Sequence, residues 1–283
     1  MNKQIKLSGT AILLIAVSLI AVFYWQSREE SMGEPLVQMP PDFALVPIYV
    51  ADINDTGYLI LVNREHSIPA EPDFGLLTPA WPTVPVSFID GMYLHPSALR
   101  AVESMLASAR VADIGSFFVS SGFRGYDLQA ELYNGGENSA FALPPGHSEH
   151  HTGLAADIMA VGVGQWDLGN SPQGRWLESN SYRYGLILRY PQGAEEITGI
   201  VFEPWHFRYV GRVHAYFMRR NGLVLEEYIG LLREQSGIFF QKNGITYYIS
   251  HQVPENGMIF LPYGMEFTIS SDNLGGYIIT AWT

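Results

Sequence analysis

The chain has 283 residues, enough for one sizeable core and a smaller appended module. It carries 16 basic and 28 acidic residues, a formal charge of −12, so its electrostatics give no reason to expect a nucleic-acid partner. It contains no cysteine, so disulfides cannot stabilise the fold and any bound metal must be held by nitrogen and oxygen atoms.

The N-terminal region predicts a membrane anchor. Lys3 and Lys6 precede an uncharged, largely aliphatic run, residues 7–26, whose twenty residues would span about 30 Å as a helix, the thickness of a hydrocarbon core. The run ends in bulky aromatics at residues 23–25, whereas a cleaved signal peptide, the alternative, would end in small residues. Because lysines precede the span, we expect the N-terminus inside and everything after about residue 30 outside the cytoplasm.

Composition divides the chain into four parts. Residues 1–30 are the expected transmembrane anchor, and the polar, proline-bearing residues 31–45 are typical of a stalk. Residues 46–235 alternate short apolar runs with amphipathic segments, which predicts an α+β domain. Residues 236–283 predict a small all-β module, because an Asn-Gly pair separates two apolar, aromatic runs near its start.

Within the α+β domain, apolar periodicity predicts the elements in chain order. A helix should begin near Pro96, with Leu99, Val102, Leu106 and Ala109 on its apolar side. The other expected elements are a buried strand at residues 58–62, a strand at 117–120, a short helix at 127–134, a strand at 154–161, a strand from 200 through 206, a helix ending at 221 and a helix at 225–233.

Two short segments contain the residues that a zinc peptidase needs. They are residues 148–157, with the sequence SEHHTGLAAD, and residues 203–206, with the sequence EPWH. Together they offer two histidines and a carboxylate to hold one zinc ion, an open position for water, and a further carboxylate as base. His147 and His151 lie beside His150, so spacing leaves open which histidine of the first segment is a ligand.

The order of polar residues in the second segment also suggests a cleft. In a strand, His206 and Arg208 point to one face, which we expect to look into the cleft, and the aromatic residues between and after them point to the core. Glu203 precedes Pro204, which favours extended backbone and could aim the carboxylate beside His206.

These segments resemble the VanY-like D-alanyl-D-alanine carboxypeptidases of the LAS metallopeptidase group. The resemblance rests on Ser-x-His-x-x-Gly-x-Ala-x-Asp at residues 148–157 and Glu-x-Trp-His at 203–206. Residues 121–129, SGFRGYDLQ, and residues 61–64, LVNR, resemble two further family elements, so the resemblance covers about residues 58–230. His151 stands where the family often has glutamine, and Gly125 where it usually has serine.

The resemblance implies an α+β fold of the LAS type, in which a small antiparallel sheet carries the metal site and helices flank it. It implies one zinc ion per chain. The residues that it assigns are His150, Asp157 and His206 as zinc ligands, Glu203 as the base, Arg124 for the developing oxyanion or the substrate carboxylate, and Ser148, Tyr126 and Gln129 in the substrate pocket.

The implied function is a zinc D,D-carboxypeptidase of the bacterial cell membrane that hydrolyses the terminal D-Ala-D-Ala bond of peptidoglycan stem peptides. An L,D-carboxypeptidase that trims tetrapeptides is the main alternative, because it shares the same metal chemistry. A free dipeptidase is expected in the cytoplasm, and an inactive wall-binding protein is expected to lack a ligand or the base. Histidines outside the motifs are expected to be structural; these are His66, His95, His214 and His251.

Overall fold

The computed structural model describes residues 43–68, 70, 74–81, 87–89, 91–137, 142–235 and 237–283, all within one compact unit. The predicted anchor and most of the predicted stalk lie outside these residues. Within the described ranges, no helix is long and apolar enough to cross a bilayer.

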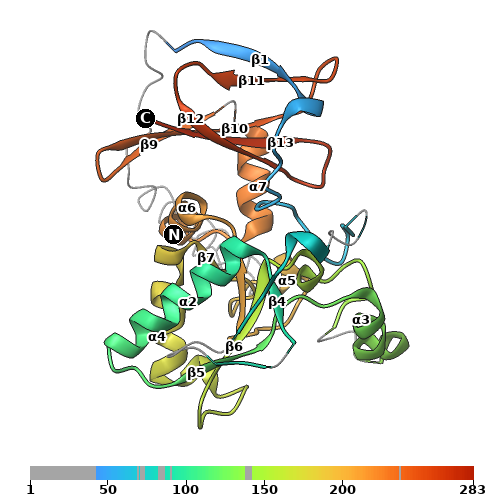
Figure 1. The fold of residues 1–283 in the computed structure, drawn as a ribbon, viewed down its shortest axis with the longest axis vertical. Helices are drawn as coiled ribbons and strands as arrows, with labels where there is room; N and C mark the ends of the chain where they lie inside the picture. The colour runs from blue at the N-terminus through green and yellow to red at the C-terminus, as the bar shows by residue number, and fades with distance from the viewer. Residues whose placement is uncertain are drawn as a thin grey trace, which may run out of the picture. The chain divides into compact units, whose positions relative to one another are not determined.

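A five-stranded sheet lies at the centre of the α+β part of the chain (Figure 1). Its strand order is β3-β5-β6-β8-β7, and every neighbouring pair is antiparallel except β3 and β5. The strands that carry the motif residues are therefore antiparallel, as predicted. The strands are β3 (Ser87–Phe88), β5 (Phe117–Ser121), β6 (Ala155–Ala160), β7 (Leu186–Leu188) and β8 (His206–Tyr209).

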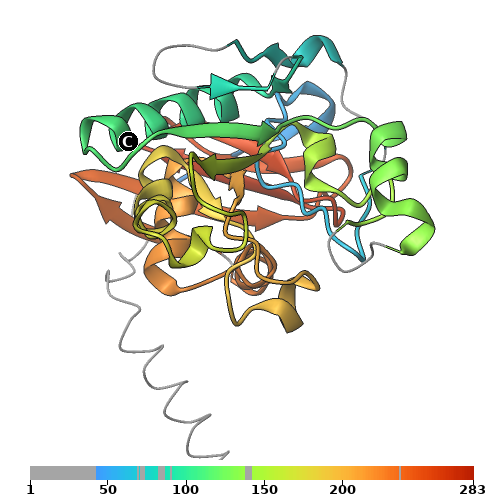
Figure 2. The same cartoon turned by 90° about the horizontal axis from the view of Figure 1, so that it is seen from below.

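Helices α2 (Pro96–Val111) and α4 (Pro172–Asn180) cover one face of this sheet (Figure 2). The start of α2 follows from its sequence, because the ring of His95 accepts the N–H of Ser97 at 3.1 Å and proline occupies the first helical position. The apolar side of α2 packs on alternate strand residues such as Ile158 and Phe207. Strand alternation therefore turns their neighbours, Asp157 and His206, to the opposite face.

Helices α3, α6 and α7 confirm predicted elements, whereas α4, α5 and strand β7 were not predicted from the sequence. Helix α3 starts one residue before the predicted position, and α6 and α7 end and begin where the sequence indicated. These elements are α3 (Tyr126–Tyr133), α5 (Glu195–Thr198), α6 (Arg212–Asn221), α7 (Leu225–Glu234) and a small ribbon of β2 (Thr78–Pro79) with β4 (Tyr93–Leu94).

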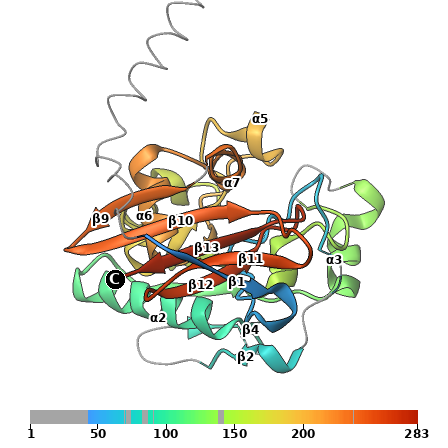
Figure 3. The same cartoon turned by 90° about the horizontal axis from the view of Figure 1, so that it is seen from above.

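The C-terminal residues form the predicted β module, a four-stranded antiparallel sheet in the order β12-β13-β10-β9 (Figure 3). Asn243 and Gly244 both have positive φ, 53° and 81°, as a two-residue hairpin turn requires. Helices α6 and α7 share one apolar cluster with β9, β10 and β13. The strands are β9 (Ile238–Lys242), β10 (Ile245–Gln252), β11 (Met258–Pro262), β12 (Glu266–Ser271) and β13 (Tyr277–Trp282).

A second, two-stranded ribbon joins the start of the described chain to this module. Strand β1 (Leu45–Tyr49) pairs with β11, and the inward side chains Ile48, Ile259 and Leu261 cluster with apolar residues of β12 and β13. The β module thus includes a strand that lies about 190 residues earlier in the sequence. The predicted boundaries at residues 45 and 235 stay predictions.

Residues 58–62 do not form the predicted strand, although Leu59 and Leu61 are buried as expected. Their backbone groups bond partly to side chains and partly to the carbonyls of Gly57 and Asp272, and no strand ladder forms. The guanidinium of Arg208 donates to the carbonyls of Tyr58 and Ile60, each at 3.0 Å, and the hydroxyl of Ser270 accepts from the N–H of Leu59 at 2.8 Å. A segment whose backbone groups are satisfied in this way has no need of a ladder.

The predicted strand from residue 200 also begins later than expected. Residues 200–203 lie outside any strand, Pro204 and Trp205 form a turn, and β8 starts at His206. Proline has no N–H to donate to a ladder, which explains why pairing starts only after Pro204.

Candidate active site

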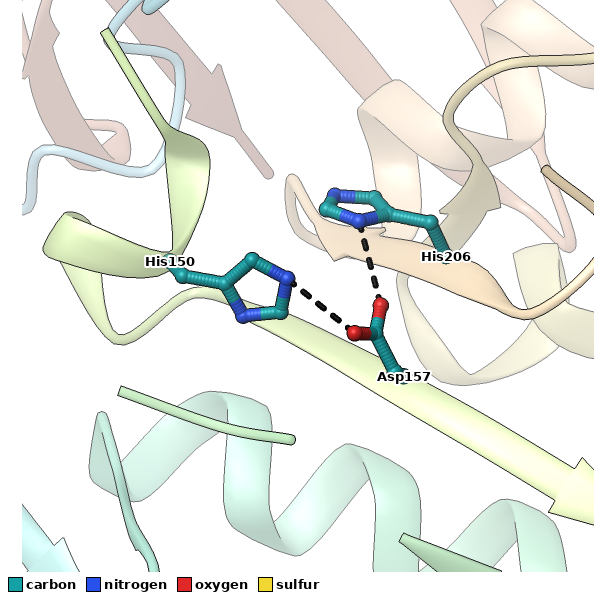
Figure 4. Close-up of side chains that lie close together, drawn as sticks. All are labelled: His150, Asp157 and His206. Carbon is teal, nitrogen blue, oxygen red and sulfur yellow. Dashed lines mark ion pairs between the residues drawn. The ribbon is translucent and has the colours of Figure 1, made fainter. Parts of the chain in front are cut away.

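Strand register places two of the candidate ligands opposite each other. Asp157 on β6 is the direct partner of His206 on β8. His150 comes from the short 3-10 helix Glu149–Thr152, whose N-cap, Ser148, accepts the N–H of His150 at 3.4 Å. The two oxygens of Asp157 face different histidines, with Oδ2 3.4 Å from His150 Nε2 and Oδ1 3.2 Å from His206 Nδ1 (Figure 4).

The spacing of these donor atoms suits a zinc ion. Zinc binds imidazole nitrogen and carboxylate oxygen at about 2.0–2.2 Å, so neighbouring ligands of a tetrahedral site lie about 3.3–3.6 Å apart. Each histidine nitrogen lies at such a separation, to about 0.1 Å, from one of the two Asp157 oxygens, and one ligand atom from each of the three residues lies within 4.8 Å of the others. Within the described residues, Asp157 Oδ1 is buried without a hydrogen-bond partner, as expected of an atom that a cation would satisfy.

Hydrogen bonds distinguish His150 from its neighbour. Nδ1 of His150 donates to the carbonyl of Gly122 at 2.7 Å, which leaves Nε2 as the lone pair that faces Asp157. Both nitrogens of His151 are already used, because Nδ1 donates to the carbonyl of Arg124 at 2.6 Å and Nε2 accepts the N–H of Gly146 at 3.0 Å. The geometry therefore favours His150 as the ligand of the first segment.

The other histidines make local contacts outside this cluster. His147 donates from Nδ1 to the carbonyl of Asn63 at 2.8 Å. The four histidines expected to be structural have the following partners: Asn63 for His66, the N–H of Ser97 for His95, Tyr228 and Thr280 for His214, and Asp272 for His251.

Glu203 lies in a turn that brings it beside the ligand cluster. Its N–H donates to the carbonyl of Tyr190 at 3.1 Å, and its own carbonyl accepts the N–H of His206 at 3.2 Å. The carboxylate Oε2 lies 3.7 Å from His206 Nδ1. Burial raises the pKa of Glu203 to about 7, although the nearby His206 opposes the shift. A carboxyl group with a pKa near neutrality can both accept and return a proton.

Arg124 adds a fixed positive charge to the same region. Its Nη1 donates to Gln129 Oε1 at 2.8 Å, and its Nη2 donates to Ser121 Oγ at 3.1 Å and lies 3.8 Å from Asp157 Oδ2. Gln129 is fully enclosed and donates to the carbonyl of Leu143 at 2.6 Å. In the structure Gln129 therefore holds Arg124 in place. The family resemblance had assigned Gln129 to the substrate pocket and did not indicate this supporting role.

A pocket of about 320 Å³ opens over the cluster, and its wall includes the three candidate ligands together with Arg124, Gln129, Ser148 and Glu203. Sequence reasoning did not assign Trp166 or Tyr190, which also line it. Trp166 is 57% exposed and packs edge-on against Trp205 at 4.8 Å, and only its place in a loop rich in small and polar residues could have indicated a rim position. The ring of Tyr126 packs against His151 at 4.6 Å, and its predicted pocket role stays a prediction.

A buried charge network lies behind His206, and the sequence did not predict it. Arg208, expected in the cleft, is completely buried, and its Nη1 donates to Glu149 Oε1 at 2.9 Å. Arg189 donates to the same oxygen at 2.8 Å and makes two further bonds, at 2.6 and 2.9 Å, to Glu226. An arginine directly after the apolar residues of β7 is the sequence feature that could have indicated a buried ion pair.

The charges around His206 favour a cation. Burial lowers the pKa of His206, but the close contacts with Asp157 and Glu149 outweigh burial and raise it to about 9. Burial and the Arg124 guanidinium together lower the pKa of His150 to about 4. The carboxylates therefore concentrate negative charge on the side of His206 and Asp157, where a bound divalent cation would lie.

Two histidines and a carboxylate at the base of a pocket, with an acid and an arginine beside them, define the metal site of a mononuclear zinc hydrolase. Comparisons with known proteins agree. Residues 91–212 match the family described as "VanY: D-alanyl-D-alanine carboxypeptidase". A D-alanyl-D-alanine carboxypeptidase of Enterococcus faecium is 38% identical over 192 residues, which are 68% of this chain and 62% of that relative.

Solved structures extend the similarity to the fold. The D,D-dipeptidase VanXYg, in complex with a D-Ala-D-Ala phosphinate analogue, has a TM-score of 0.72 at 25% identity and covers 85% of this chain and 99% of its own. The D,D-pentapeptidase VanY, in complex with Zn(II), has a TM-score of 0.51 at 35% identity, and the match covers 61% of this chain and 98% of that one. The LD-carboxypeptidase LdcB has a TM-score of 0.54 at 32% identity, and the match covers 60% of this chain and 84% of that one.

The chain therefore belongs to the VanY family of zinc peptidases. The α+β fold with a C-terminal β module agrees with this assignment, and VanXYg is similar over more of the chain than the peptidase motifs alone.

Proposed function

We propose that the chain is a membrane-anchored zinc D,D-carboxypeptidase that hydrolyses the terminal D-Ala-D-Ala bond of peptidoglycan stem peptides. The observation that carries this proposal is the convergence of His150, Asp157 and His206 at the base of a pocket that also holds Glu203. The names of the relatives support the substrate class, since they specify D-alanyl-D-alanine peptides.

In the proposed reaction His150, Asp157 and His206 hold a zinc ion, which when bound polarises the scissile carbonyl and makes water more acidic. Glu203 accepts a proton from the attacking water while the new C–O bond forms. Glu203 then delivers that proton to the amide nitrogen while the C–N bond breaks. The products are free D-alanine and a peptide that is one residue shorter and ends in a new carboxylate.

Arg124 is the proposed electrostatic partner of the reaction. Negative charge develops on the carbonyl oxygen during attack, and the substrate brings a second anion in its terminal carboxylate. Arg124 can stabilise either one without reorganising, because Gln129 and Ser121 already fix its guanidinium. Ser148 lines the same pocket, and we propose it and Tyr126 as further substrate contacts.

The proposed location follows from the apolar run at residues 7–26. We propose an anchor at residues 1–30, a stalk at 31–45, a peptidase domain at 46–235 and a β module at 236–283. An anchored domain outside a bacterial cell membrane would be confined near its cell-wall substrate, which raises the effective concentration of substrate without tighter binding. Recovery of the full chain in the washed membrane fraction, with the catalytic domain accessible to external protease, tests this part of the proposal.

The alternative activity is L,D-carboxypeptidase, favoured by the similarity to LdcB. The experiment incubates the detergent-solubilised full chain with defined stem pentapeptide and, separately, tetrapeptide, and identifies the released residue by mass spectrometry. We expect D-alanine from the pentapeptide and no shortening of the tetrapeptide. Release from the tetrapeptide alone would establish the alternative. Zinc binding without hydrolysis of either peptide would indicate a wall-binding protein.

A further inference from the structure

We propose that Glu149 is a positioning residue for the metal site, whose carboxylate holds the imidazole of His206 with its proton on Nε2 and its Nδ1 lone pair facing the zinc position. This inference rests on the zinc site of the proposed function, and it assigns a role to a residue outside the cluster of candidate ligands.

The two nitrogens of His206 face different surroundings. Nδ1 lies 3.2 Å from Asp157 Oδ1 and 3.7 Å from Glu203 Oε2, on the side where a zinc ion would bind. Nε2 instead faces a different carboxylate, 3.4 Å from Glu149 Oε2. An imidazole that coordinates through Nδ1 carries its proton on Nε2, and that proton needs a buried acceptor.

Glu149 is the acceptor that the described part of the chain provides. Its Oε2 and the Nε2 of His206 are both buried, and among the described residues neither atom has a hydrogen-bond partner. At 3.4 Å the pair is slightly longer than a well-formed hydrogen bond, and it needs to close by only about 0.4 Å to reach the usual 3.0 Å. The side chain of Glu149 is fully enclosed, so water does not compete for this position.

The other oxygen of Glu149 is fully used, which orients the carboxylate. Oε1 accepts from Arg189 Nε at 2.8 Å and from Arg208 Nη1 at 2.9 Å, so only Oε2 is available to His206. These arginines are fixed in turn, Arg189 by Glu226 and Arg208 by two backbone carbonyls. The two guanidinium groups also bring positive charge directly against the enclosed carboxylate.

A purely structural role for Glu149, neutralising two buried arginines, predicts different consequences. In Glu149→Gln the amide can keep its oxygen on the arginines and then presents N–H donors to His206 Nε2. Such donors favour the opposite tautomer, with the proton on Nδ1, which cannot coordinate zinc. Glu226→Gln is the matched control, because it removes a negative charge from Arg189 while its amide oxygen can still accept from the guanidinium and keep Arg189 against Glu149.

The test uses the full chain, labelled with ¹⁵N-histidine and solubilised in detergent. It measures zinc affinity by competition with a chelator and the His206 tautomer by long-range ¹H–¹⁵N NMR of the zinc-loaded protein. We expect wild type to carry the proton on Nε2, Glu149→Gln to bind zinc about 10- to 100-fold more weakly, and Glu226→Gln to stay within about threefold of wild type.

Equal zinc affinity and an unchanged tautomer in Glu149→Gln would overturn the inference, as would an equal loss of affinity in Glu226→Gln. If Glu149→Gln does not fold by circular dichroism, Glu149→Asp replaces it, since the shorter side chain keeps the charge and withdraws from the ring. Wild-type affinity and tautomer in Glu149→Asp then overturn the inference. Absence of zinc binding by wild type would instead refute the proposed function, so the two failures are distinguishable.

Discussion

Replacement of Glu203 by glutamine separates catalysis from metal binding. Glu203 is 6% exposed, and its Oε2 lies 3.7 Å from Nδ1 of the ligand His206, so an amide of the same size fits without a cavity. Glutamine cannot accept the proton of the attacking water. Loss of a general base reduces turnover by about 10²- to 10⁴-fold, which is about 3–5 kcal/mol of activation free energy.

The assay compares kcat for D-alanine release from stem pentapeptide in wild type, Glu203→Gln and the control Glu178→Gln, an exposed position on α4 outside the pocket. Zinc content is measured on the same samples, and we expect one zinc ion per chain in all three. A Glu203→Gln variant that retains one tenth of the wild-type kcat with full zinc content would refute the assignment of Glu203 as the base. Loss of zinc in this variant would show that Glu203 acts through the metal site instead.

Further predictions concern the oxyanion partner, a strained turn and a buried histidine. Arg124→Met should lower kcat/KM by about 10²- to 10³-fold, because it removes the charge that stabilises the oxyanion or the substrate carboxylate. Zinc binding in chelator titrations should not weaken, because the lost charge is a positive one near Asp157. Weaker zinc binding would contradict the assignment of Arg124 to the substrate. Gly153→Ala should lower the free energy of unfolding, measured by urea denaturation, by about 1–3 kcal/mol more than Gly162→Ala. Both glycines have positive φ, but only at Gly153 would a Cβ lie 2.6 Å from Leu77. Equal losses in the two variants would contradict the packing argument. Burial lowers the pKa of His214 to about 3, so the unfolded chain binds a proton below about pH 6.5 that the folded chain does not. Zinc-free wild type should therefore lose about 2 kcal/mol more stability between pH 7 and pH 5 than His214→Gln, and an equal loss in both would remove His214 as the cause.

Much of the candidate site could be predicted because its residues are local in sequence. The His150 to Asp157 segment and the Glu203 to His206 segment each carry their spacing within ten residues, so short motifs sufficed to name them. The sequence could not choose between His150 and His151 by spacing. Only the distant partners of His151, Arg124 and Gly146, show that its ring nitrogens are already used.

The charge network is the part of the site that sequence reasoning missed. Arg208 was expected in the cleft because strand alternation places it on the face of His206. That face was predicted correctly. At Arg208, however, residues 58–62 cover the face, and the guanidinium donates hydrogen bonds to two of their carbonyls. The same contact explains why residues 58–62 are buried without being a strand. Both errors have one cause, since alternation assigns a side to a residue but does not show what covers that side.

The sequence by itself determined the elements whose information is local: helix α2 from its cap and apolar periodicity, the hairpin at Asn243-Gly244 from its turn residues, and the ligand motifs from their spacing. Tertiary structure decided the rest, because these features depend on contacts between residues far apart in the chain. The pairing of Asp157 with His206 joins strands 49 residues apart in the sequence, and the contact of Arg208 with Tyr58 joins residues 150 apart. The free energy of such contacts depends on burial and geometry that only the folded chain supplies.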